Sequence, residues 1–337
     1  MRFIPRSVNA MIRAGAGIAP VRTGLPRKAR IALALSAGLA SALYVAWVQW
    51  RVPGPGRDFD PIWVAARAIL AHEDPYRAVA EWGWRFPLYH PLPAMLVAAP
   101  FAILPLMAAR VAFAGVSGSL LGFAACGSAW WPLLFLVSAP YRHAMMELQW
   151  SPVLTAVTLL PALAGLLAVK PSIGLALFLS RPSVSAVVGG SALVLLSLAI
   201  WPSWPVAWWH EARKLTHLAP VVRPGGALLF LGLLRWKRPE GRLLAALALI
   251  PHRPVGYDML PILVLVPNRV IEMLVLMLGS EIAFRFASGL PGTMQIDAYD
   301  AASWPAYFAF VYIPALIIVL LRPRTVAAEP GPTSTER

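Results

Sequence analysis

The sequence predicts an all-α, polytopic membrane helix bundle. Of its 337 residues, 59% are apolar and only 13% are charged, and the mean hydropathy is +0.67. A soluble domain of this size could not bury so much apolar surface. Long runs of Leu, Ala and Val, without the alternating pattern of strands, favour helices over a barrel.

The basic residues at the N-terminus set the predicted orientation. The net charge is +14, and residues 1–30 contain seven Arg or Lys residues and no acid. Cytoplasmic flanks of membrane helices carry such an excess, and anionic lipids attract it. We therefore predict a basic cytoplasmic segment over 1–30 and a retained signal-anchor helix over 31–50. This distribution explains the positive charge without a nucleic-acid partner.

Further apolar runs follow along the chain, and about 20 apolar residues are needed to cross a bilayer. The longer runs are 91–107, 111–128, 151–169, 184–200, 270–287 and 304–321. The shorter ones are 130–139, 172–180, 226–234, 243–250 and 259–266. Short or broken helices are tolerated where their backbone lies inside protein or lines a cavity. We expect about 10–12 transmembrane helices in a domain over 31–322, followed by a disordered cytoplasmic tail over 323–337.

Basic clusters at 235–242 and 322–324 are placed in the cytoplasm together with the N-terminus. The segments that this alternation puts outside are 51–90, Lys170, 201–225, His252-Arg253 and 288–303. The expected location is the inner (plasma) membrane, with several passes and both termini cytoplasmic.

The first outer loop, 51–90, is rich in acids, with five of the 15 acidic residues between Asp58 and Glu81. Apolar residues recur within it at helical spacing: Ile62, Ala65, Ala66, Ile69 and Leu70. This spacing predicts an amphipathic helix lying on the membrane surface. Asp58 and Asp60 are either solvated loop residues or, at the membrane rim, the source of a general base.

Cationic candidates lie on the same predicted side. Lys170 stands between two apolar runs, where it either snorkels to the interface or binds a phosphate group. His252 and Arg253, with Tyr257 and Asp258 close behind, could surround an anionic ligand. The aromatic loop 201–225 adds His210, Arg213, Lys214 and His217.

Other kinds of site are not supported. Asp297 and Asp300 could hold a divalent cation, but no further ligand pattern accompanies them, so we predict no metal. The single cysteine, Cys126, cannot form a disulfide within one chain. Gly15-Ala16-Gly17 lacks a preceding strand and a third glycine. The chain has no Walker lysine loop, H-E-x-x-H or G-x-S-x-G motif, which argues against ATP-driven or hydrolase chemistry.

A series of motifs is similar to a known pattern. Its members are Asp58-Phe59-x-x-x-Trp63-x-Ala65-Ala66-Arg67, Asp74-Pro75-Tyr76, Phe86-Pro87-Leu88-Tyr89-His90-Pro91-Leu92-Pro93, Pro100-Phe101-Ala102-Ile103-Leu104-Pro105, Gln149-Trp150-Ser151-Pro152 and Lys170-Pro171-Ser172-Ile173-Gly174. Together they resemble glycosyltransferase family 87, the polyprenol-phosphate-mannose-dependent mannosyltransferases of the membrane GT-C class. The likeness covers roughly residues 40–185. Two positions depart from the pattern: His90 stands in place of a proline, and Leu148 in place of a glycine.

The resemblance implies an inverting transfer of a sugar, mannose or another hexose or pentose, from a polyprenyl-phosphate carrier to an acceptor hydroxyl on the extracytoplasmic face. It places the catalytic base at Asp58. We expect the donor phosphate to be bound by Lys170, Arg253 and His252. The expected substrate-binding residues are Asp60, Tyr89, His90, Gln149, Tyr257 and Asp258. No cofactor is predicted, and the expected partners are the lipid-linked sugar, a lipid or glycan acceptor and the bilayer.

Two other functions remain open from the sequence. A transporter or flippase for a lipid-linked or small solute would also contain broken helices and charges within the membrane. Such a protein predicts paired interruptions in two related halves, and no internal repeat is found. A non-catalytic partner in a cell-envelope complex would tolerate substitution of Asp58 and Lys170.

Overall fold

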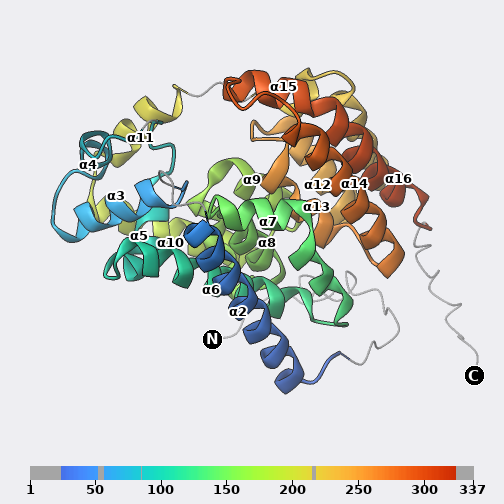
Figure 1. The fold of residues 1–337 in the computed structure, drawn as a ribbon, viewed down its shortest axis with the longest axis horizontal. Helices are drawn as coiled ribbons and strands as arrows, with labels where there is room; N and C mark the ends of the chain where they lie inside the picture. Colours follow the sequence, from blue (N-terminus) through green and yellow to red (C-terminus); the bar gives the residue numbers. More distant parts are fainter. Residues whose placement is uncertain (1–23, 52–56, 85, 215–217, 324–337) are drawn as a thin grey trace, which may run out of the picture.

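The computed structural model describes residues 24–51, 57–84, 86–214 and 218–323, and over these ranges it contains helices and no strand. Figure 1 shows the helices gathered into one bundle. The all-α prediction is confirmed for the described residues. Most of the predicted basic segment 1–30, His217, and all of the predicted tail except residue 323 lie outside them.

The α-helices are α2 (Arg27–Arg51), α3 (Asp60–Leu70), α4 (Pro75–Glu81), α5 (Leu92–Ala102), α6 (Leu106–Ala125), α7 (Ala139–Met146), α8 (Ser151–Leu159), α9 (Pro171–Ser180), α10 (Val184–Ile200), α11 (Trp204–Ala212), α12 (Pro239–Leu249), α13 (Leu260–Leu265), α14 (Val270–Ser288), α15 (Ile296–Tyr307) and α16 (Ile313–Leu321). Short 3₁₀ segments are η1 (Trp131–Val137), η2 (Pro161–Val169), η3 (Pro220–Val222), η4 (Gly226–Arg235) and η5 (Gly256–Met259), and η6 (Phe308–Tyr312) is a π-helix.

Few of these helices are long enough to cross a membrane. In the described part of the chain, Arg27–Arg51, Leu106–Ala125 and Ile296–Leu321 are long and apolar enough, and α10 with α11 would make a fourth if that bent pair is one span. The structure therefore supports three or four candidate spans where the sequence predicts about 10–12. Proline is one reason, because it begins α5, η2, α9 and α13 in their first turns and cannot continue a helix that precedes it. The long helix α14 is excluded by its charged side chains, Glu272, Glu281 and Arg285.

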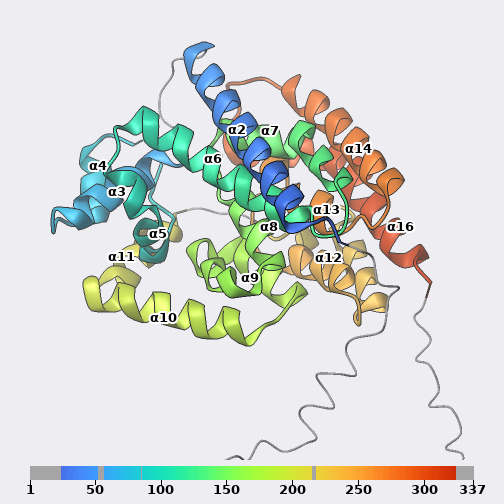
Figure 2. The same cartoon turned by 90° about the horizontal axis from the view of Figure 1, so that it is seen from below.

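The pair α2 and α6 lies side by side in both views (Figures 1 and 2). Small residues let the two backbones approach closely, as in many membrane helix pairs. A Cβ atom on Gly38 would lie 2.6 Å from the carbonyl oxygen of Gly115. The hydroxyls of Ser41 on α2 and Tyr141 on α7 are hydrogen-bonded at 2.5 Å, which joins this pair to the next helix.

The predicted amphipathic helix in the first outer loop is confirmed as α3. Ile62, Ala65 and Ala66 are fully buried, and α3 packs against α5 and α4. Protein therefore covers this part of the apolar stripe, where the sequence predicts contact with the membrane surface, whereas Leu70 at the end of the stripe is 53% exposed. The helix serves as part of the wall on which the preceding turn, residues 57–60, is built.

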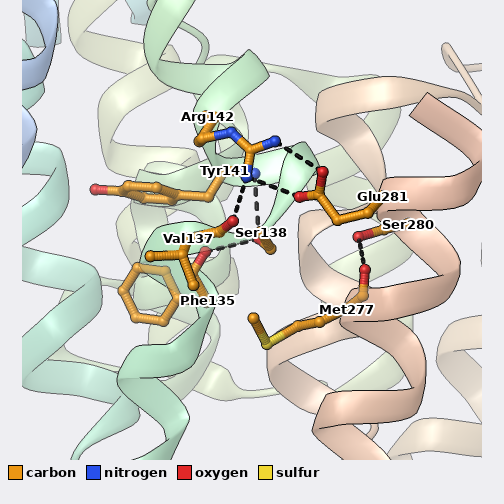
Figure 3. Close-up of polar contacts among 8 residues, drawn as sticks. All are labelled: Phe135, Val137, Ser138, Tyr141, Arg142, Met277, Ser280 and Glu281. Carbon is orange, nitrogen blue, oxygen red and sulfur yellow. Dashed lines mark hydrogen bonds and ion pairs between the residues drawn. The ribbon is translucent and has the colours of Figure 1, made fainter. Parts of the chain in front are cut away.

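An ion pair connects two segments that lie 139 residues apart in the chain. Arg142 on α7 donates to both carboxylate oxygens of Glu281 on α14, at 2.7 and 2.9 Å (Figure 3). Arg142 also donates to the carbonyl of Val137. Planar, bidentate pairs of this kind fix orientation as well as distance, so α14 is held against α7.

Candidate active site

One cavity of about 260 Å³ gathers nearly all of the residues that the sequence singles out. It lies where the turn before α3, the loop before α5, the α7–α8 turn, the η2–α9 junction, α11 and residues 251–258 meet. The predicted site residues that line it are Asp58, Tyr89, His90, Gln149, Lys170, His252, Arg253, Tyr257 and Asp258. Segments up to 200 residues apart, from Asp58 to Asp258, thus form one site.

A chain of hydrogen bonds crosses this cavity from one carboxylate to another. The side-chain amide of Gln149 donates to Asp58 through Nε2, and its Oε1 accepts from Lys170 Nζ at 3.2 Å. Lys170 Nζ also donates to the two oxygens of Asp258 at 3.0 and 3.2 Å. Gln149 is therefore the link that places a carboxylate and an ammonium group in the same small space.

Local packing fixes the position of Asp58. Its backbone N–H donates to the carbonyl of Glu147 at 3.1 Å. The next residue, Phe59, is fully buried and stacks on Phe113 with 4.5 Å between ring centroids. The backbone hydrogen bond of Asp58 and the buried ring of Phe59 fix this turn, so the Asp58 carboxylate has a defined position on the cavity wall.

The backbone before Gln149 has an unusual conformation. Leu148 has a φ of 53°, in the left-handed region that non-glycine residues rarely adopt. Such conformations cost on the order of 1–3 kcal/mol and persist where the surroundings enforce them. Here the following residue, Trp150, is buried and packs edge-on against Phe113 at 5.2 Å. The same aromatic ring thus secures both Asp58 and Gln149.

Lys170 lies at the break between η2 and α9, with an extended backbone (φ −139°, ψ 86°). Its side chain is 15% exposed, and that of Asp258 is 2% exposed. Ser151 Oγ donates to Asp258 Oδ1 at 2.6 Å. Asp258 thus accepts from both a lysine and a serine, and it serves as the buried counter-ion that keeps the ammonium group at the cavity.

A second cation, Arg253, lies close to the same aromatic ring as Lys170. Lys170 Nζ lies 5.1 Å from the centroid of the Tyr257 ring, and the guanidinium carbon of Arg253 lies 5.5 Å from it. Arg253 Nε also donates to Asp300 on α15 at 3.1 Å. An aromatic ring attracts nearby cations, so Tyr257 adds to the pairing of Lys170 with Asp258 and of Arg253 with Asp300. Tyr257 therefore keeps two positive groups close to the same cavity.

The two cavity histidines differ in their hydrogen bonding. His252 is buried, and its Nδ1 lies 2.8 Å from the carbonyl oxygen of Ile250. A carbonyl only accepts, so Nδ1 carries the proton. His90 lies on a loop whose carbonyls accept from Tyr76 Oη, at 3.4 Å, and from Trp208 Nε1, at 2.7 Å to Tyr89. Its own Nε2 is buried and has no hydrogen-bond partner among the described residues.

Burial, together with the positive charge of Lys170, lowers the pKa of His90 to about 3, while Asp258 opposes the shift. Below pH 6.5 His90 is protonated in the unfolded chain but stays neutral in the folded protein down to about pH 3. Lowering the pH through this range therefore favours the unfolded state. At pH 5 this amounts to about 2 kcal/mol. We expect His90→Gln to match the wild-type melting temperature at pH 7.5 and to exceed it at pH 5. Melting curves across this pH range check the result, and equal acid sensitivity of the two proteins would contradict it.

Asp60 does not line the cavity. Its carboxylate binds Arg110 on α6 through two hydrogen bonds, one of them 2.8 Å long, and accepts from the backbone N–H of Arg57 at 2.6 Å. Asp60 is fully buried and the Arg110 side chain is 8% exposed. The structure therefore gives Asp60 an ion-pairing role behind the turn that carries Asp58, rather than the substrate contact expected from the sequence.

Asp300, like Asp60, forms an ion pair with an arginine. Asp300, one half of the Asp297/Asp300 pair, is engaged by Arg253. In the described ranges, no group of three His, Cys, Asp or Glu side chains is placed to hold a metal ion. Asp300 instead extends the cavity's polar network to α15.

An apolar groove of about 700 Å³ adjoins the polar cavity. Helices α5, α9, α10 and α11 form its walls, with Phe178 and Leu195 among its lining residues. Pro171 and Trp208 line both the groove and the cavity. The site as a whole therefore joins a polar, charged pocket to a long apolar one.

No known relative is found. No family model, no curated protein and no solved structure matches the chain. The likeness to glycosyltransferase family 87 consequently rests on the motif series alone, and functional conclusions depend on the cavity.

Some site residues are not evident from the sequence. Ser151 belongs to the Gln149-Trp150-Ser151-Pro152 motif, so its spacing from Gln149 could have indicated a shared site. Trp208 is hidden among the tryptophans of the 201–225 loop, and nothing in the local pattern separates it from Trp209. From the sequence, Arg110 is interpreted only as the charge that ends an apolar run. Its partner Asp60 is 50 residues away, so no local pattern indicates the ion pair.

Proposed function

We propose that this chain is a membrane glycosyltransferase that moves a sugar from a polyprenyl-phosphate carrier to an acceptor hydroxyl, with inversion, and that Asp58 is the general base. The observation that carries the proposal is the single cavity in which a carboxylate, an ammonium group and a guanidinium group meet next to an apolar groove. The motif series around the same residues supports it independently of the geometry.

The charges suit the two halves of such a reaction. A carboxylate within hydrogen-bond reach can take the proton of an attacking hydroxyl. Lys170 and Arg253 can stabilise the negative charge on the departing lipid phosphate, since fixed cations act on developing anions. Gln149 hydrogen-bonds to both Asp58 and Lys170 and so holds them in one network. The base and the phosphate site would then lie on opposite sides of the reacting carbon.

The apolar groove suits the carrier. A polyprenyl chain needs a long apolar surface, and the groove offers about 700 Å³ lined mostly by aliphatic and aromatic side chains. It meets the cavity at Pro171, beside Lys170. A chain lying in the groove would therefore bring its terminal phosphate toward the ammonium group.

The backbone at Leu148 adds support to the family resemblance. The family pattern has glycine at this position, and a left-handed φ is what glycine adopts without strain. The φ of 53° at Leu148 is therefore compatible with the glycine of the family pattern, although Leu148 itself departs from that pattern.

The direct test supplies purified protein in lipid vesicles with a polyprenyl-phosphate sugar labelled in the sugar, and follows label into lipid or glycan acceptors. Stereochemistry at the anomeric carbon of the product is read by NMR. Transfer with inversion supports the proposal. Movement of intact donor to the other leaflet, without a new glycosidic bond, would support transport instead.

Lys170→Met tests the phosphate contact. Losing one charged hydrogen-bond donor to the donor phosphate should raise KM for the lipid-linked sugar on the order of 10–100-fold. The matched control is Lys237→Met, which changes an exposed lysine in the turn before α12 and should leave transfer unchanged.

Because Lys170→Met also leaves Asp258 unpaired, the double variant Lys170→Met/Asp258→Asn is measured beside it. We expect the same increase in KM for both. A double variant with wild-type KM would show that the defect comes from the unpaired carboxylate and not from the lost phosphate contact.

A further inference from the structure

The chain changes direction sharply between α10, an apolar helix of 17 residues, and α11. Helix α11 follows α10 after a break of three residues and is bent by 106° relative to it. Away from the apolar groove, α10 exposes further apolar side chains, with Val184 79% and Val188 62% exposed. Figure 2 shows α10 at the edge of the bundle. If α10 crosses the bilayer, α11 runs across its end, at the level where the hydrocarbon gives way to headgroups.

The two faces of α11 have different surroundings. Trp204 is 6% exposed and lines the apolar groove, Ala212 lines the polar cavity, and Trp208 lines both. The indole N–H of Trp208 donates to the carbonyl of Tyr89 at 2.7 Å, which fastens this face to the loop before α5. The inner face of α11 is thus the wall at which groove and cavity join.

The outer face combines apolar, aromatic and basic side chains. Val206 is 67% exposed and Trp209 62% exposed, and His210 and Arg213 are exposed beside them. At 100° per residue, positions 206, 209 and 213 fall on one stripe of the helix. Tryptophan is enriched at the membrane–water boundary, and arginine beside it can reach outward to the headgroups. Exposing Val206 and Trp209 to water is unfavourable, whereas the headgroup layer can solvate the apolar, aromatic and basic side chains of this stripe.

We propose that α11 lies in the headgroup layer of the membrane that α10 crosses, with Val206, Trp209 and Arg213 in contact with lipid. Its inner face at the same time forms the wall between the apolar groove and the polar cavity. Lipid therefore contacts the outer face of the helix whose inner face lines the site. This placement does not depend on sugar transfer, and it would hold equally for a protein that transports a lipid.

Spin labels placed at single cysteines test the position of α11. Cys126 is first replaced by alanine, and cysteine is then introduced at Val206, at Trp209, at Arg213 and, as a bilayer reference, at Val188. These side chains are exposed, so labelling leaves the packing intact. The protein is placed in nanodiscs of zwitterionic and anionic phospholipid, and accessibility to oxygen and to a polar nickel complex gives the depth of each label.

We expect labels at Val206 and Trp209 to lie within about 10 Å of the phosphate plane on its hydrocarbon side, clearly shallower than the label at Val188, with Arg213 at the phosphate plane. Water-like accessibility at all three positions of α11 would overturn the proposal. A depth at Val206 and Trp209 equal to that of Val188 would also overturn it, because α11 would then be the second half of a broken span. Neither outcome bears on whether the cavity transfers sugar.

Discussion

Asp58→Asn is expected to lower kcat/KM for sugar transfer by about 10²–10⁴-fold, the usual contribution of a positioned general base. Asparagine has nearly the same shape and can still accept a hydrogen bond from Gln149, so the wall of the cavity is retained. What it loses is the ability to take a proton from the acceptor hydroxyl. Transfer of label from the polyprenyl-phosphate sugar, measured in vesicles with purified protein, gives the ratio.

The control for this variant is Glu73→Gln, which neutralises an exposed carboxylate in the same loop. It should leave transfer at the wild-type rate. Donor binding by Asp58→Asn should also stay near the wild-type value, because the phosphate contacts lie elsewhere in the cavity. Unchanged transfer by Asp58→Asn would remove Asp58 from the mechanism.

Asp258 is the other carboxylate in the cavity, and its surroundings suit a different role. It accepts from Lys170 at 3.0 Å and from Ser151 at 2.6 Å. A carboxylate so engaged is a poor proton acceptor for a substrate hydroxyl, since taking the proton would break its pairing with Lys170. Residual transfer by Asp58→Asn that disappears on further change of Asp258 would nevertheless assign the base role to Asp258.

Membrane topology predicts a shared side for these residues but not that they meet. Alternating the basic clusters across the membrane puts Asp58, Lys170 and His252-Arg253 on one side, whereas their meeting in one cavity is visible only in the structure. Helix α3 could be predicted from its apolar spacing, as could the break at Lys170-Pro171. What the apolar stripe of α3 contacts could not be predicted, because such a stripe suits a lipid surface and a protein neighbour equally well.

The sequence predicts about 10–12 spans, whereas three or four of the described helices are long and apolar enough to cross a membrane, for a related physical reason. Hydropathy does not distinguish an apolar helix that crosses a bilayer from one that is short and buried among others. Pro171–Ser180 is apolar throughout, yet it is 10 residues long and packs on α12, η2 and α8. Long-range ion pairs are equally hidden, since nothing near Arg110 or Asp60 in the sequence indicates that they belong together.

Asp60→Ala is expected to lower the free energy of unfolding by about 3–5 kcal/mol, because it leaves the buried guanidinium group of Arg110 without its counter-ion. The pair links α3 to α6, and Asp60 is fully buried. Denaturant titration of the protein in bicelles measures the loss. The comparison is Glu81→Gln, which breaks the exposed pair between Arg77 and Glu81 and should produce no measurable change.

Replacing both members, as Asp60→Leu/Arg110→Met, separates stability from positioning. Removing both charges leaves none buried and unpaired, so most of the lost stability should return. The turn of residues 57–60 nevertheless loses the carboxylate that accepts from the N–H of Arg57. Because Asp58 lies in that turn, we expect transfer to stay on the order of tenfold below wild type despite the recovered stability, since small displacements of a catalytic group are costly. Full recovery of both would show that the pair supports the fold and has no part in placing Asp58.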